Sequence, residues 1–133
     1  LSNYSLKTKI KVHEYYTPHW VLQFYTMDRD KFAFNLNIAA NTICLEIRLS
    51  AETVEALAIR KMEITDQLKA ELHKFGCISC NKQCNKENLK ETNGICYCTA
   101  YSEARLLMFY ITTEKDVASS LMILDFESKN LSW

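Results

Sequence analysis

Five of the chain's six cysteines lie within the segment 77–98, which reads CISCNKQCNKENLKETNGICYC. Their spacing is C-x2-C-x3-C-x11-C-x-C. Zn²⁺ in structural sites is held tetrahedrally by four thiolate or imidazole ligands. Since every clustered candidate ligand is sulfur, no position is left open for water, and the pattern predicts a structural zinc site. The clustered cysteines are Cys77, Cys80, Cys84, Cys96 and Cys98.

Two pairs of cysteines have suitable ligand spacing. Cys77 and Cys80 form a C-x2-C knuckle, and Cys96 and Cys98 leave the same face of an expected strand because side chains alternate along it. Cys84 is a fifth candidate, which either replaces one member of the second pair or stays unliganded. His73 precedes the cluster by one helical turn, and a surface role is its simpler interpretation.

Three other chemistries compete with zinc. Six cysteines could pair as disulfides in a secreted domain, as two glycosylation triplets at 3–5 and 130–132 would fit. Iron–sulfur clusters also use thiolates, but in other spacings. A redox C-x2-C pair is expected to open a helix. Here it follows the end of a predicted helix, where the helix dipole raises the pKa of a thiol.

A zinc ion would fix the polar loop 81–94, which is expected to lack a core of its own, to the edge of a sheet. Elsewhere the chain offers little catalytic chemistry. Two glycines cannot build a phosphate-binding loop, and Cys44 is expected to be a buried, inert thiol. An enzyme is the alternative, with a pocket formed by aromatic and charged side chains. They are Trp20, Tyr25, Tyr110, Glu103 and Arg105.

Strict alternation of apolar and polar residues predicts antiparallel strands with one solvated face. The expected strands are 6–16, 20–25, 31–38, 43–49, 95–101 and 105–111, the last being apolar on both faces and therefore central. In 31–38, Phe32, Phe34, Leu36 and Ile38 are expected to share one face. This pattern predicts an α+β fold, with helices mainly on one face of an antiparallel sheet.

Helical spacing replaces this alternation in two regions. Ser50 and Thr65 are expected N-caps of one kinked or two short helices over 51–75, with Gly76 as the terminating residue. Thr113 and Asp116 form a capping-box pattern that opens a helix to about 126. The expected buried residues are Val54, Leu57, Ala58, Met62, Leu68, Leu72 and Phe75 in the first region, and Val117, Leu121 and Leu124 in the second.

Length and charge limit the function classes. At 133 residues the chain is expected to be one domain, 1–133, and its formal net charge of zero argues against non-specific nucleic-acid binding. No apolar run approaches the roughly 20 residues of a membrane span. The chain opens with LSNYSLKTKI, without an initiator Met or a signal-type apolar stretch, so we expect a fragment or a processed chain.

The segment 101–124 carries Tyr101, Glu103, Ala104 and Arg105, an apolar strand, and then Glu114, Asp116 and Val117. This arrangement resembles the closing strand and helix of small uncharacterised bacterial α+β domains of the YjbR-like type, and the hairpins in 20–49 resemble their central sheet. The cysteine segment departs from that pattern as an insertion. The resemblance implies a bacterial origin and the binding of a ligand or partner, without an enzymatic activity to carry over.

These observations predict a non-enzymatic domain of the cytoplasm that binds a small molecule or a protein partner and contains a structural zinc. A secreted, disulfide-bonded interaction domain is a third alternative.

Overall fold

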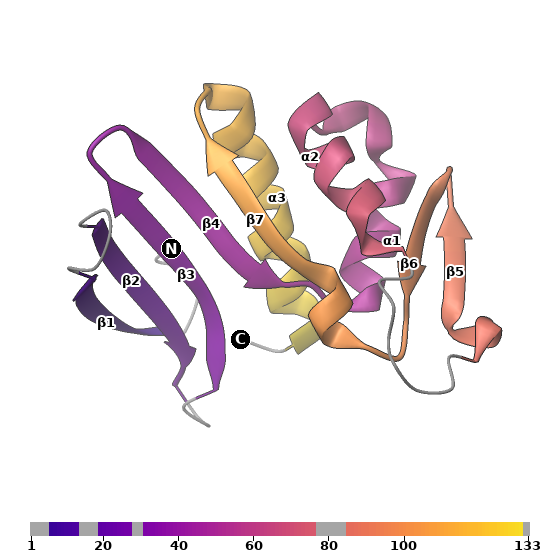
Figure 1. Cartoon of the computed structure of the whole chain (residues 1–133), viewed down its shortest axis with the longest axis horizontal. Coiled ribbons are helices and arrows are strands. Elements are labelled where there is room, and N and C mark those ends of the chain that lie inside the picture. The colour runs from indigo at the N-terminus through magenta and orange to yellow at the C-terminus, as the bar shows by residue number, and fades with distance from the viewer. Residues whose placement is uncertain (1–5, 14–18, 28–30, 77–84, 132–133) are drawn as a thin grey trace.

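The computed structural model describes residues 6–13, 19–27, 31–76 and 85–131. Within these residues the fold is α+β, as predicted: an antiparallel sheet, a separate two-stranded hairpin and three α-helices (Figure 1). In Figure 1 the helix α3 (Glu114–Leu131) lies behind β4 (Thr42–Arg48) and β7 (Leu106–Ile111). None of the described helices is both long enough and apolar enough to cross a bilayer.

The five-stranded sheet has the order β1-β2-β3-β4-β7, and every neighbouring pair is antiparallel. The remaining strands of this sheet are β1 (Leu6–His13), β2 (His19–Thr26) and β3 (Phe32–Ala39). The predicted hairpins are therefore confirmed. The prediction that 105–111 is central is wrong: among the described strands β7 pairs with β4 alone, and its outer face exposes Leu106, Met108 and Tyr110.

The core lies between one face of the sheet and the helices. Phe34 is opposite Phe24 on β2 and Ile47 on β4, and all three are buried. The rings of Phe24 and Phe34 stack with centroids 4.4 Å apart. Phe32 does not share this face as predicted, because the pairing shifts between Phe24 and Tyr25, and Phe32 packs edge-on against Tyr25 instead.

Two short helices follow β4 in the chain, α1 (Ala51–Ile59) and α2 (Asp66–Leu72). Ser50 and Thr65 cap them as predicted, since each side chain accepts a hydrogen bond from a backbone N–H three residues ahead. The prediction that Met62 is buried is wrong: α1 ends at Ile59 and Met62 is 90% exposed in a 3₁₀ turn, Lys61–Glu63. Gly76 follows a second such turn, His73–Phe75, with an extended backbone.

The closing helix α3 begins with the predicted capping box, in which Asp116 N donates to Thr113 Oγ1 and Thr113 N donates to Asp116 Oδ2. Of the three residues of α3 predicted to be buried, only Leu124 is. Val117 and Leu121 are exposed by 45% and 52%. The inward face of α3 instead contains several polar residues. Two of them are charged and hydrogen-bonded: Glu127 accepts from Ser50, and Asp116 accepts from Thr112 and Thr113. The buried residues are Asp116, Ser119, Ser120, Ile123, Leu124 and Glu127.

A second hairpin pairs β5 (Leu89–Thr92), which lies in the expected loop 81–94, with β6 (Ile95–Cys98), which lies within the expected strand 95–101. Its two-residue turn is Asn93-Gly94, with φ of 51° and 81°. Asn-Gly favours this left-handed turn, so the sequence carries a local signal for a hairpin at 93–94, which was not among the predictions. Ile95 and Tyr97 belong to the main core, so the hairpin packs against it through β6.

Candidate functional site

The apolar face of the sheet continues beyond the helices. Cross-strand pairing places Val12 opposite Trp20, Trp20 opposite Ile38, and Ile38 opposite Ile43. These residues share the face that carries the core residues Phe34 and Leu45. The open apolar face, as it is called here, is the part of this face beyond the buried core. Its exposed residues are Ile10, Val12, Trp20 and Ile43, and its partly buried residues are Leu22, Leu36 and Ile38.

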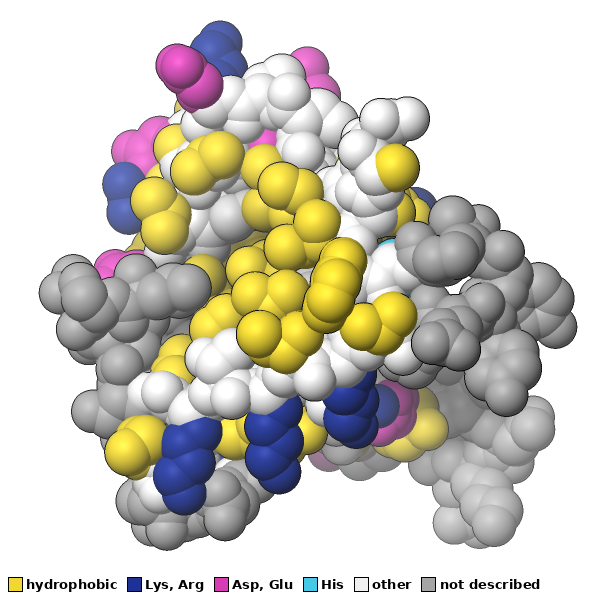
Figure 2. All heavy atoms as spheres, turned by 90° about the vertical axis from the view of Figure 1, so that its left-hand side faces the viewer, with side chains coloured by type: hydrophobic (Ala, Val, Ile, Leu, Met, Phe, Trp, Pro, Cys, Tyr) yellow, Lys and Arg dark blue, Asp and Glu magenta, His cyan; other side chains and the backbone are white. Residues whose placement is uncertain are grey.

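Large side chains of this face are exposed to solvent. Ile10 is 64% exposed, Trp20 54%, Val12 49% and Ile43 41%. Figure 2 shows a continuous apolar band on the side of the molecule formed by β1 and β2. Contiguous exposed apolar patches, unlike isolated exposed residues, mark binding surfaces.

Helix α3 borders the open apolar face. The ring of Phe126 lies near the Arg60 guanidinium at the end of α1, so this flank of α3 faces α1. Val117 lies nine positions earlier, about two and a half turns, and therefore points away from α1 toward the other side. Ile111, the last residue of β7, pairs with Ile43. α3 begins three residues after Ile111, so its first turns, which contain Val117 and Leu121, lie at the Ile43 end of the sheet.

The lysines of β1 lie on the sheet face opposite the open apolar face, since side chains alternate along the strand. Strand β1 alternates Thr8, Ile10 and Val12 with Lys7, Lys9 and Lys11. A row of basic side chains follows one border of the apolar band in Figure 2. The Lys9 ammonium lies 4.9 Å from the centroid of Tyr25. Within the described parts of the chain, neither Lys9 nor Lys11 is in an ion pair.

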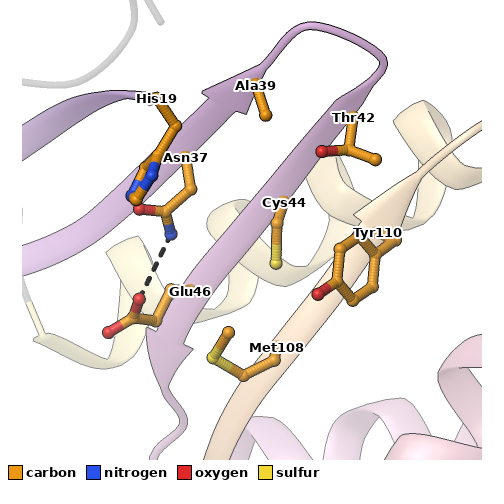
Figure 3. A pocket seen from close by; sticks show the side chains of 8 residues that line it. All are labelled: His19, Asn37, Ala39, Thr42, Cys44, Glu46, Met108 and Tyr110. Carbon is orange, nitrogen blue, oxygen red and sulfur yellow. Dashed lines mark hydrogen bonds between the residues drawn. The ribbon is translucent and has the colours of Figure 1, made fainter. Parts of the chain in front are cut away.

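A pocket of about 360 Å³ opens on the opposite face of the sheet. Figure 3 shows Cys44 at its floor, between Asn37 and Tyr110, with the Asn37 amide donating to Glu46 Oε2 at 3.2 Å. The pocket is lined by His19, Asn37, Ala39, Thr42, Cys44, Glu46, Met108 and Tyr110.

The pocket lacks an activated nucleophile. Cys44 is 4% exposed, which confirms the prediction of a buried thiol. Burial raises the pKa of this thiol, the carboxylates of Glu46 and Glu71 raise it further, and a backbone hydrogen bond at Phe109 opposes them. The thiol is therefore protonated at neutral pH, whereas nucleophilic cysteines need a lowered pKa.

The residues of the alternative enzyme site do not converge. Trp20 and Tyr110 lie on opposite faces of the sheet. Glu103 pairs with Arg48 at 2.9 Å rather than with Arg105. Arg105 is buried in the 3₁₀ turn Ser102–Arg105 and donates to the carbonyls of Leu49, at 2.8 Å, Cys98 and Tyr101. Its guanidinium joins the hairpin to the sheet and is not available to a substrate.

Of the predicted metal ligands, the structure describes Cys96, Cys98 and His73, while Cys77, Cys80 and Cys84 lie outside the described residues. Ile95 and Tyr97 face the core, so alternation places Cys96 and Cys98 on the other face of β6, as predicted. Cys44, Cys96 and Cys98 carry free thiols. The described residues alone contain no group of three or more potential metal ligands.

Comparisons with protein-family models, curated proteins and solved structures find no match. The resemblance to YjbR-like domains therefore stays a prediction. The geometry favours the open apolar face as the candidate functional site.

Proposed function

We propose that this chain is a non-enzymatic binding domain whose partner covers the open apolar face. One observation supports this most strongly: the sheet face and the Val117–Leu121 stripe of α3 expose apolar side chains around the same region. A helix can hide such a stripe by rotating toward the core. Here Glu127, on the inward face of α3, instead accepts two hydrogen bonds from Ser50 at the start of α1, which oppose such a rotation.

The energetic gain from a partner is substantial. Burial of a large apolar side chain contributes about 1.5–3 kcal/mol. Ile10, Val12, Trp20 and Ile43 together would therefore supply several kcal/mol toward association. Trp is also among the residues that dominate the energy of protein interfaces.

A structural zinc bound by the cysteine segment is a second part of the proposal. Cys96 and Cys98 lie on one face of β6 and carry free thiols, Cys96 half-buried and Cys98 buried. Two ligands would then come from 77–84. Free thiols at Cys44, Cys96 and Cys98 also suit a reducing compartment, which supports a cytoplasmic location over the secreted alternative.

Photo-crosslinking tests the binding function. A photoreactive amino acid replaces Trp20 in one variant and Tyr110, on the opposite face, in a matched variant. Both are expressed in bacterial cells and irradiated. We expect a discrete crosslinked product from position 20 that is absent from position 110. Equal products from both positions, or none from position 20, would refute the proposal.

A small-molecule ligand in the 360 Å³ pocket is the second candidate, since the pocket combines an aromatic ring with the Asn37–Glu46 pair. A ligand detected by native mass spectrometry and lost in Tyr110→Ala would favour it.

A further inference from the structure

We infer that the 360 Å³ pocket on the sheet face opposite the open apolar face binds a small organic ammonium ion. Its N–H groups pair with Glu46, and its apolar body contacts Tyr110 and Met108. This ligand class rests on the small-molecule function given as the second candidate. It is independent of the partner that covers the open apolar face.

The pocket has a polar side and an apolar side. Figure 3 shows the Asn37 and Glu46 side chains on one side of Cys44 and the Tyr110 ring on the other. The strand pairing agrees, since it places Asn37 and Tyr110 on either side of Cys44, and Met108 directly opposite Glu46. Small-molecule sites combine apolar walls with a few polar groups in volumes of roughly 300–1,000 Å³, and this pocket has that character.

The charge of the polar side comes from Glu46. Its carboxylate accepts a hydrogen bond from the Asn37 amide at 3.2 Å. In the described part of the chain, no Lys, Arg or His side chain forms an ion pair with Glu46. Burial raises the pKa of the Cys44 thiol and the Glu46 carboxylate raises it further, so this negative charge acts within the pocket. A cationic ligand is therefore complementary to the site.

A second acceptor beside Glu46 favours a cation that carries N–H groups. Asn35 lies directly opposite Glu46 across β3 and β4, and its Oδ1 atom is buried with no hydrogen-bond partner in the described structure. Opposite side chains have Cβ atoms about 5 Å apart, so one ammonium group can lie near both acceptors. An unsatisfied buried acceptor is costly, and a donor there removes that cost. A quaternary ammonium ion has no N–H to offer.

The lysines of β1 lie on the same face of the sheet as the pocket but at a distance from it. Lys9 is opposite Gln23, which is opposite Asn35, and Asn35 is opposite Glu46. The strands β1 and β4 are therefore three spacings apart, about 14 Å at 4.8 Å per strand. The Debye length is about 10 Å at 0.1 M salt, so the lysine charges are largely screened at Glu46. The Lys9 ammonium itself lies 4.9 Å from the ring centroid of Tyr25.

The test uses three probes of similar shape and different charge: 2-phenylethylamine, 2-phenylethanol and 3-phenylpropionate. Each is titrated into the full chain at pH 7, at low and at high salt. Backbone amide shifts in ¹⁵N NMR spectra give both the dissociation constant and the place of binding. Circular dichroism is the folding control for each variant.

We expect the amine to bind about fivefold more tightly than the alcohol at low salt, with the largest shifts in 35–46 and 108–111. High salt should reduce this preference. Glu46→Gln should remove the difference between amine and alcohol, whereas Tyr110→Ala should weaken the binding of both. Glu55→Gln, at an exposed position of α1, is the matched control and should change neither dissociation constant.

Equal binding of amine and alcohol in the pocket, or tighter binding of phenylpropionate, would overturn the ammonium class and leave a small-molecule site of other chemistry. An amine preference that survives in Glu46→Gln would overturn it as well. If no probe shifts the pocket residues, both the ligand class and the second candidate function are wrong. The partner-binding function is read separately, from crosslinking at position 20 on the other face of the sheet, so its failure and this one are distinguishable.

Discussion

Glu127, near the end of α3, accepts hydrogen bonds from both the backbone N–H and the hydroxyl of Ser50, at 2.6 and 2.8 Å. Ser50 is the N-cap of α1, so one fully buried carboxylate couples the end of one helix to the start of another. The positive end of the α1 dipole favours the negative charge there. Asn130, on the next turn of α3, donates to Thr53 at 2.9 Å and strengthens the same junction.

Glu127→Ala is expected to lower the free energy of unfolding by about 2 kcal/mol, because it leaves the partly buried N–H of Ser50 without its charged acceptor. Urea denaturation followed by circular dichroism measures the change. Glu55→Ala, at an exposed position of α1, is the matched control and should remain within about 0.5 kcal/mol of the parent. Equal effects of the two substitutions would show that the junction contributes nothing specific.

Asp116→Asn is expected to destabilise the protein at neutral pH by about 1 kcal/mol. Burial works to raise the pKa of Asp116, but hydrogen bonds from Thr112 and Thr113 together hold it below its ordinary value of 3.8. Because the folded-state pKa is depressed, the carboxylate stabilises the fold above the unfolded-state pKa. This contribution is lost as the pH falls below about 4 and through the folded-state pKa.

The measurement for Asp116 is the free energy of unfolding of parent and variant between pH 7 and pH 3. The two should converge as the pH falls. Asp125→Asn, which alters only an exposed pair with Lys129, serves as the control and should show a smaller difference. A difference between Asp116→Asn and the parent that is unchanged at pH 3 would contradict the assignment.

Cys44 is expected to react with iodoacetamide at least about tenfold more slowly in the folded protein than in urea at the same pH, because its buried thiol has a raised pKa. Peptide mass spectrometry after timed quenching gives the rate for this cysteine alone. Tyr110 lies opposite Cys44 across β4 and β7, so Tyr110→Ala should expose the thiol and increase the rate. Rapid labelling in the folded parent protein would refute the burial argument.

Arg105→Lys is expected to cost about 2–3 kcal/mol, since an ammonium cannot reproduce the guanidinium's bonds to the carbonyls of Leu49, Cys98 and Tyr101. Hydrogen exchange should show the largest loss of protection in the β5–β6 hairpin. Arg48→Lys is the control, because Arg48 forms an exposed pair with Glu103. Uniform loss of protection across the sheet would argue against a local role for Arg105.

Removal of the proposed zinc is expected to increase hydrogen exchange within 77–98 while the five-stranded sheet keeps its protection. The reason is that the sheet core forms without any residue of this segment except Ile95 and Tyr97. Metal analysis should give one zinc per chain before chelation. Absence of bound zinc after purification in zinc-containing buffer, or collapse of the far-ultraviolet circular dichroism on chelation, would refute this prediction.

Local features of the fold could be predicted from the sequence. Alternation predicted the strands, because each antiparallel strand of this sheet has one apolar face. The caps at Ser50, Thr65 and Thr113 were also predictable, since an N-cap needs only a side-chain oxygen and a backbone N–H two or three residues later. The Asn93-Gly94 turn is equally local, since its left-handed backbone depends only on these two residue types.

Periodicity shows which residues could share a face, but not what will cover that face. The placement of β7 at an edge, the shift that exposes Phe32 and the rotation of α3 that exposes Val117 depend on contacts between distant segments. Arg105 and Leu49 are 56 residues apart, and Glu127 and Ser50 are 77 apart. The sequence alone thus determined the secondary structure and the apolar character of the sheet, whereas only the tertiary structure decided which part of that apolar face remains open to a partner.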